Sequence, residues 1–74
     1  MKLRLYAIKD ELNGFTAPIP INNDESAKRY FKEMKTHNAT IAIQTGDFSI
    51  WYIGEFETEN GEITNHKPEL IERG

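Results

Sequence analysis

The chain contains no cysteine and only one tryptophan among its 74 residues. Without cysteine, neither a disulfide framework nor a thiolate metal site can form, and many small extracellular domains depend on one of the two. An intracellular protein is therefore expected. A chain of this length forms one domain at most, and its core is modest.

Long apolar runs are also missing. In residues 1–9, charged side chains interrupt the apolar ones, so that neither a signal-peptide core nor a membrane span is expected. We therefore expect a soluble protein that is not secreted and has no membrane partner.

Basic residues are outnumbered, because nine Lys and Arg stand against twelve Asp and Glu, giving a net charge of −3. This balance argues against a protein that coats nucleic acid by charge alone. The charges are unevenly distributed. Residues 1–37 carry seven basic and five acidic side chains, whereas residues 38–74 carry two and seven. One part of the fold is therefore expected to be locally basic.

The alternation in residues 2–8 predicts a strand with one buried side. Leu3, Leu5 and Ala7 share one face, and the other face carries Lys2, Arg4, Tyr6 and Ile8. Residues 15–21 predict a short edge segment, because Pro18 and Pro20 cannot donate hydrogen bonds to a neighbouring strand.

A helix is predicted at about residues 24–36. Asn22 is the expected N-cap, with Glu25 in the position of a capping box. Apolar side chains then recur at helical spacing, and Asn38 can end the helix. The apolar stripe consists of Ala27, Tyr30, Phe31 and Met34.

The second half of the chain predicts two further strands. Residues 39–46 fit a short strand or an ordered loop, and residues 48–56 predict the central strand, with Gly54 as a candidate bulge. Asn60–Gly61 predicts a hairpin with a type I′ turn. The fold class is therefore α+β, a small and mainly antiparallel sheet with one helix on one face. We expect a single domain over residues 1–65 and a flexible tail over residues 66–74.

Signals of catalysis are weak. Neither His37 nor His66 lies in a nucleophile motif, and the chain has no glycine-rich phosphate loop and no paired histidines at zinc spacing. Carboxylates cluster at positions 55, 57, 59 and 62, and the first three share parity and are expected to line one solvated face of a hairpin. We expect neither an enzyme nor a bound cofactor or metal.

Basic side chains form one stripe on the predicted helix. Lys28, Lys32 and Lys35 recur at helical spacing, with Arg29 at the flank. Lys2 and Arg4 share a strand face with Tyr6, and whether they extend the patch depends on which side of the strand the helix covers. Two interpretations of this stripe stay open, a surface that binds nucleic acid and an ordinary solvent-exposed helix face.

The predicted central strand is apolar on both faces. Trp51 and Ile53 point one way, and the opposite face carries Phe48, Ile50, Tyr52 and Phe56. A helix of about 13 residues cannot cover both faces. A second copy of the chain over Trp51 and Ile53 would bury the remaining face. The alternative is a base-stacking platform that uses Tyr6, Trp51 or Tyr52.

Several segments resemble the small non-structural protein of gokushoviruses, which are single-stranded DNA phages of the Microviridae. The resemblance covers roughly residues 5–63. It is carried by Tyr6–Asp10, Phe15, Pro18, Ser26–Phe31, Asp47–Phe56 and Asn60–Gly61. Residues 41–46 depart from it, because relatives tend to have a polar loop with His-Pro there.

The resemblance implies a protein of the host bacterial cytoplasm that is absent from the virion and assists single-stranded genome synthesis or packaging. Our leading hypothesis is a homodimer that binds single-stranded DNA through Lys28, Arg29, Lys32 and Lys35, with Lys2 and Arg4. The alternative is a protein-interaction module that docks on a phage replication or capsid protein. A host-directed inhibitor that uses the acidic hairpin as a phosphate mimic is a third reading.

Overall fold

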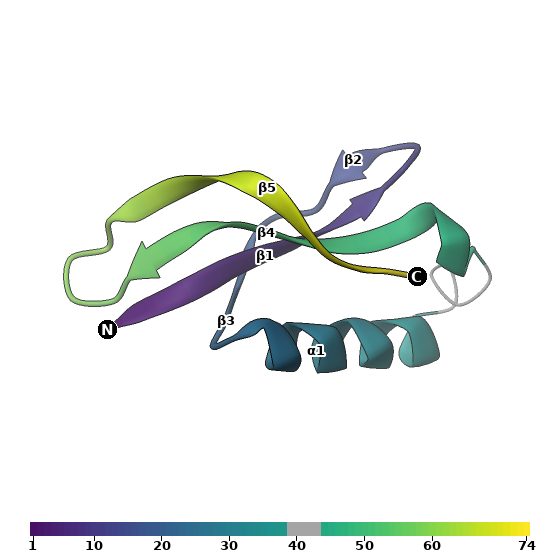
Figure 1. Cartoon of the computed structure of the whole chain (residues 1–74), viewed down its shortest axis with the longest axis horizontal. Helices are drawn as coiled ribbons and strands as arrows, with labels where there is room; N and C mark the ends of the chain where they lie inside the picture. The colour runs from purple at the N-terminus through teal and green to yellow at the C-terminus, as the bar shows by residue number, and fades with distance from the viewer. Residues whose placement is uncertain (39–43) are drawn as a thin grey trace.

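The computed structural model describes residues 1–38 and 44–74. The elements follow one another as β1 (Lys2–Asp10), β2 (Gly14–Phe15), β3 (Ile19–Ile21), α1 (Asp24–His37), the 3₁₀ helix η1 (Thr45–Asp47), β4 (Phe48–Glu57) and β5 (Ile63–Arg73). Figure 1 shows α1 lying along the sheet. One helix on an antiparallel sheet confirms the predicted α+β fold class.

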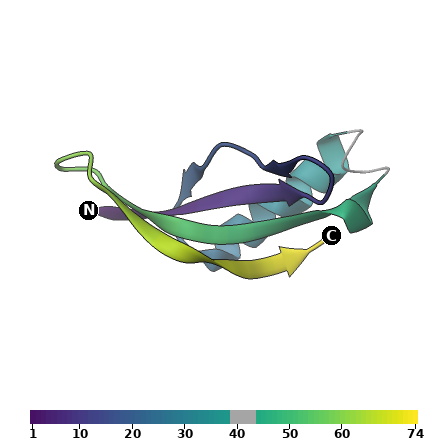
Figure 2. The same cartoon turned by 90° about the horizontal axis from the view of Figure 1, so that it is seen from above.

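The sheet has five strands, and every pairing is antiparallel. Its order is β2-β1-β4-β5, and β3 also pairs with β1. The short strands β2 and β3 therefore share one edge of the sheet, as predicted from Pro18 and Pro20, and β5 forms the other edge. Figure 2 shows one curved layer of strands with α1 behind it.

The helix begins at Asp24, as predicted, but its N-cap lies one residue later than expected. Asn23 is the N-cap, and its side-chain oxygen accepts a 2.8 Å hydrogen bond from the backbone N–H of Ser26. The prediction of Asn22 is therefore wrong by one position. Both residues are asparagine, and only the backbone geometry decides which side chain reaches the first turn. At the other end, the backbone N–H of Asn38 donates to Met34.

The helix covers the face of β1 that carries Tyr6 and Ile8. These two side chains belong to one core cluster, which also contains Ala27, Phe31, Phe48, Ile50 and Tyr52. Tyr30 and Met34 pack against it, which confirms the predicted apolar stripe of the helix. The prediction of a single buried side at Leu3, Leu5 and Ala7 is wrong. Leu5 and Ala7 are buried too, but on the face away from the helix cluster.

Strand β4 contains the bulge that Gly54 predicted. Leu5 is opposite Gly54 and Tyr6 is opposite Tyr52, so that Ile53 is an extra residue on β4. Beyond the bulge, each side chain of β4 points to the face opposite the one that simple alternation predicts. Phe56 consequently lies opposite Leu3, on the face of Trp51, and its predicted place on the Tyr52 face is wrong.

The hairpin between β4 and β5 is confirmed, but its turn is not type I′. That turn needs positive φ at both central residues, and of the pair only Gly61 has it, with φ of 75°. Residues 66–74 are also not a tail. Residues 66–73 are the second half of β5, which pairs with β4 as far as Arg73, opposite Ser49.

Residues 39–43, for which a strand or an ordered loop was predicted, lie outside the described residues. The turn-like group that follows them forms η1. Within the described part of the chain, no helix is long and apolar enough to cross a membrane.

Candidate nucleic-acid interface

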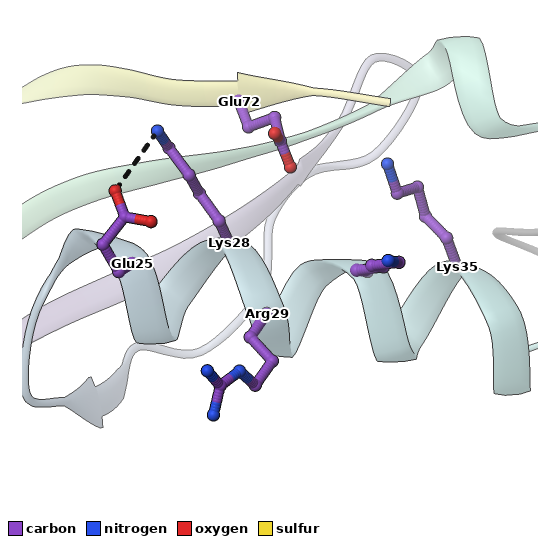
Figure 3. A pocket seen from close by; sticks show the side chains of 6 residues that line it. Glu25, Lys28, Arg29, Lys35 and Glu72 are labelled. Atoms are coloured by element: carbon purple, nitrogen blue, oxygen red, sulfur yellow. Dashed lines mark ion pairs between the residues drawn. The ribbon is translucent and has the colours of Figure 1, made fainter.

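The basic stripe of α1 borders a hollow of about 460 Å³ between the helix and the end of β5. Helical spacing brings Lys28 and Lys35 to the side of α1 that faces β5, where Figure 3 shows Glu72 of β5 near them, whereas Arg29 extends from the far side of the helix. The lining residues are Glu25, Lys28, Arg29, Lys32, Lys35 and Glu72. The structure thus brings together all four basic residues that the helix was predicted to contribute.

The hollow carries more positive than negative charge, because four cations face two carboxylates. The Lys28 ammonium lies 3.8 Å from a carboxylate oxygen of Glu25. Arg29, Lys32 and Lys35 form no ion pair with any residue that the structure describes. The Lys35 ammonium instead lies 4.8 Å from the centre of the Phe31 ring. Three cations therefore remain available to an anion.

Arg4 does not reach this hollow. Its Nη2 lies 3.2 Å from Oδ1 of Asp24, and its Nε donates a 2.8 Å hydrogen bond to the Tyr6 hydroxyl. The guanidinium carbon also lies 3.9 Å from the centre of the Tyr52 ring. Arg4 is thereby held between β1, the start of α1 and the buried aromatic side chains.

Lys2 lies in a different and acidic environment. It lines a hollow near the β4–β5 hairpin together with Glu55, Glu57 and Glu62. Carboxylates at this position repel phosphate. The structure therefore does not extend the helix stripe through Lys2 or Arg4.

Tyr6 and Tyr52 are core residues and offer no stacking surface. Tyr6 is 0% exposed, and its hydroxyl donates a 2.6 Å hydrogen bond to Asp24. Burial, followed by this hydrogen bond, raises the pKa of Tyr6 to about 12. Burial is also the main cause that raises the pKa of Tyr52. The His66 ring packs against the Tyr52 ring, with the ring centres 4.6 Å apart.

Trp51 lies on the face of the sheet opposite the helix. Its indole meets the ring of Phe15 edge to face, at 6.0 Å between centres. Ile53, the bulged residue, is half-buried and lies outside the helix-facing core cluster. Phe15 was read only as part of an edge segment, because no periodicity in the sequence reveals that it pairs beside Lys9.

Metal-binding clusters of three or more histidine or acidic side chains do not occur among the described residues. His37 is the last residue of α1, far along the chain from His66 of β5. The arrangement of the described residues thus offers surfaces for binding, with cations on one side of the sheet and aromatic rings on the other.

Searches of curated proteins and of solved structures found no match to this chain. A family model described as Phage ORF5 protein matches residues 3–74. The match spans nearly the whole chain, including β5. The chain therefore belongs to the Phage ORF5 protein family.

Proposed function

We propose that this phage protein binds single-stranded DNA without catalysing a reaction, and that it assists genome synthesis or packaging in the cytoplasm of the infected bacterium. The observation that carries the proposal is the convergence of Lys28, Arg29, Lys32 and Lys35 on one hollow. Its phage family and the resemblance to gokushovirus non-structural proteins support the same role.

Phosphate contacts of this kind have a measurable signature. Each phosphate that is neutralised releases counterions, and for single strands the slope of log K against log salt is about −0.7 per contact. Three or four contacts from the helix stripe give a slope of roughly −2 to −3. The chain as a whole carries a net charge of −3, so the attraction to phosphate comes from local basic surfaces and not from the overall charge.

The second candidate is a protein-interaction module, either a homodimer through Trp51 and Ile53 or a complex with a phage replication or capsid protein. The observation that favours it is the apolar surface on the side away from α1. Phe15 is 46% exposed there, and Ile63 is 62% exposed. Apolar patches of this kind commonly mark interfaces.

Charge reversal on the helix separates the two candidates. A Lys28→Glu/Lys32→Glu/Lys35→Glu variant should lose measurable binding to a labelled oligonucleotide, because the hollow then repels phosphate. Far-ultraviolet circular dichroism checks that the variant is folded. Unchanged affinity in a folded variant would remove the helix stripe as the binding site.

A single-charge comparison controls for the net charge of the whole protein. Lys32→Gln and Asn60→Asp each make the chain more negative by one unit, but Asn60 lies in the turn between β4 and β5. We expect Lys32→Gln to weaken binding several-fold and Asn60→Asp to leave it nearly unchanged. Equal effects of the two substitutions would point to long-range charge alone.

A further inference from the structure

The side of the sheet away from α1, which we call the open face, has a composition of its own. The register places Ala7, Trp51 and Leu70 side by side across it, and the next row is Lys9, Ser49 and Arg73. Phe15 of β2 lies beside Lys9 at the edge. Two basic residues therefore flank two aromatic residues at one end of this face.

Carboxylates are absent from the open face within β1, β4 and β5. The acidic residues of β4 and β5 all lie on the helix side, opposite residues that share that side. They are Glu55, Glu57, Glu69 and Glu72. The carboxylates of β4 and β5 thus lie on the helix side, together with Lys2 and Arg4 of β1, whereas the register places the basic residues Lys9 and Arg73 on the open face.

The aromatic residues are held in place and partly accessible. The Trp51 Nε1–H donates a 2.8 Å hydrogen bond to Oγ of the buried Ser49, which orients the indole. The Lys9 ammonium lies 5.7 Å from the Trp51 ring centre and 5.8 Å from that of Phe15. A cation therefore sits at the edge of an oriented aromatic pair.

We propose that Trp51 and Phe15 stack the bases of single-stranded nucleic acid on the open face, with Lys9 and Arg73 binding the adjacent phosphates. Oriented aromatic rings beside basic side chains are the combination by which sequence-tolerant single-strand binders hold bases and backbone together. This inference rests on the proposed single-strand binding, and it adds a second contact surface to the helix stripe.

The two surfaces adjoin across the edge strand. Glu72 and Arg73 are successive residues of β5, and Glu72 lines the hollow beside α1 while Arg73 takes the opposite face. In the described part of the chain β5 has no neighbour beyond it. A single strand that crosses this edge can touch the hollow and the open face together.

A second copy of the chain fits the open face less well than a polyanion does. In a symmetric face-to-face dimer, each open face meets another open face. Lys9 and Arg73 would then find no carboxylate on the partner sheet, and burying an unpaired charge is costly. Phosphates supply the missing negative charge.

Trp51 reports on its own surroundings, because it is the only tryptophan. We would titrate the intact protein with an oligothymidylate and with an abasic strand of the same length, and follow both Trp51 fluorescence and the anisotropy of a label on the strand. Stacking predicts quenching by the oligothymidylate, and a roughly five-fold or greater loss of affinity for the abasic strand.

Substitutions of the two aromatic residues test whether the bases stack on them. Trp51→Leu and Phe15→Leu keep an apolar side chain but remove the ring, and each should weaken binding roughly 5- to 100-fold. Ile63→Ser removes an exposed apolar side chain near the hairpin and should have no effect. If both leucine variants bound the oligothymidylate as tightly as the native protein does, the stacking site would be overturned.

The outcomes also separate this inference from the proposed function. Binding with unquenched Trp51 and equal affinity for the abasic strand would overturn base stacking and leave single-strand binding in place. Absence of any anisotropy change would overturn both. A shift of Trp51 emission with protein concentration alone, without DNA, would show that a second copy covers the face and would overturn the inference.

Discussion

The hydroxyl of Tyr6 donates a 2.6 Å hydrogen bond to Oδ1 of Asp24, and thereby connects the interior of β1 to the first residue of α1. The same hydroxyl accepts a hydrogen bond from Arg4. We expect Tyr6→Phe to lower the free energy of unfolding by about 1–2 kcal/mol, since both charged partners lose a partly buried hydrogen bond. Urea denaturation measures this loss.

The matched control for this substitution is Tyr30→Phe. Tyr30 packs against the same core, but its hydroxyl makes no hydrogen bond with the described residues. Its removal should change the free energy of unfolding by less than about 0.5 kcal/mol. Equal effects of the two substitutions would mean that the Tyr6–Asp24 hydrogen bond contributes nothing.

Alkaline pH should remove the contribution of Tyr6. Its pKa is raised to about 12 in the folded protein, first by burial and then by Asp24, whereas tyrosine in an unfolded chain has a pKa of about 10. The unfolded state therefore loses its proton first. The stability difference between the native protein and Tyr6→Phe should be constant below pH 10 and shrink between pH 10 and 12. A difference that grows over this interval would contradict the assignment.

The helix cap provides a neighbouring pair of asparagines. Asn23→Ala removes the side chain that accepts from Ser26, and should cost about 1 kcal/mol. For a domain of this size that corresponds to a fall in Tm of about 4–8 °C. Asn22→Ala should have little effect, because its exposed side chain makes no hydrogen bond to the described residues. A fall in Tm that is larger for Asn22→Ala than for Asn23→Ala would show that the helix cap is Asn22.

Gly54 is required where β4 and β5 approach each other at the bulge. A Cβ atom there would lie 2.6 Å from the backbone oxygen of Thr64, which cannot move without shifting β5. We expect Gly54→Ala to cost about 1–3 kcal/mol in the free energy of unfolding. Gly46→Ala is the control, because nothing lies within 4 Å of its added Cβ. Equal thermal stability of the two variants would contradict the close approach.

Short-range patterns predicted the elements well. The apolar stripe from Ala27 to Met34 and the alternation of residues 2–8 correspond to α1 and β1. Apolar residues on both faces of β4 also showed that one helix cannot cover the sheet. These features depend on local periodicity, which the sequence displays directly.

Features that depend on pairing were missed. The bulge at Ile53 moves the side chains that follow it in β4 to the opposite face of the sheet. The predicted face of Phe56 was wrong for this reason. Residues 66–73 carry few apolar side chains, yet they form a strand because β4 offers an open edge for backbone hydrogen bonds. Strand pairing also determines parts of the candidate binding surfaces that the sequence did not predict. The helix stripe was predictable from its spacing, whereas the approach of Glu72 to it and of Phe15 to Trp51 depends on strand register.

The most direct test of single-strand binding is fluorescence anisotropy of labelled single-stranded and double-stranded oligonucleotides against the purified protein, across a range of salt. We predict tighter binding to the single strand and a loss of affinity of roughly 20- to 50-fold between 50 mM and 200 mM salt, from three or four phosphate contacts. No binding at 50 mM salt, or an affinity that does not change with salt, would contradict the account and favour the protein-interaction module.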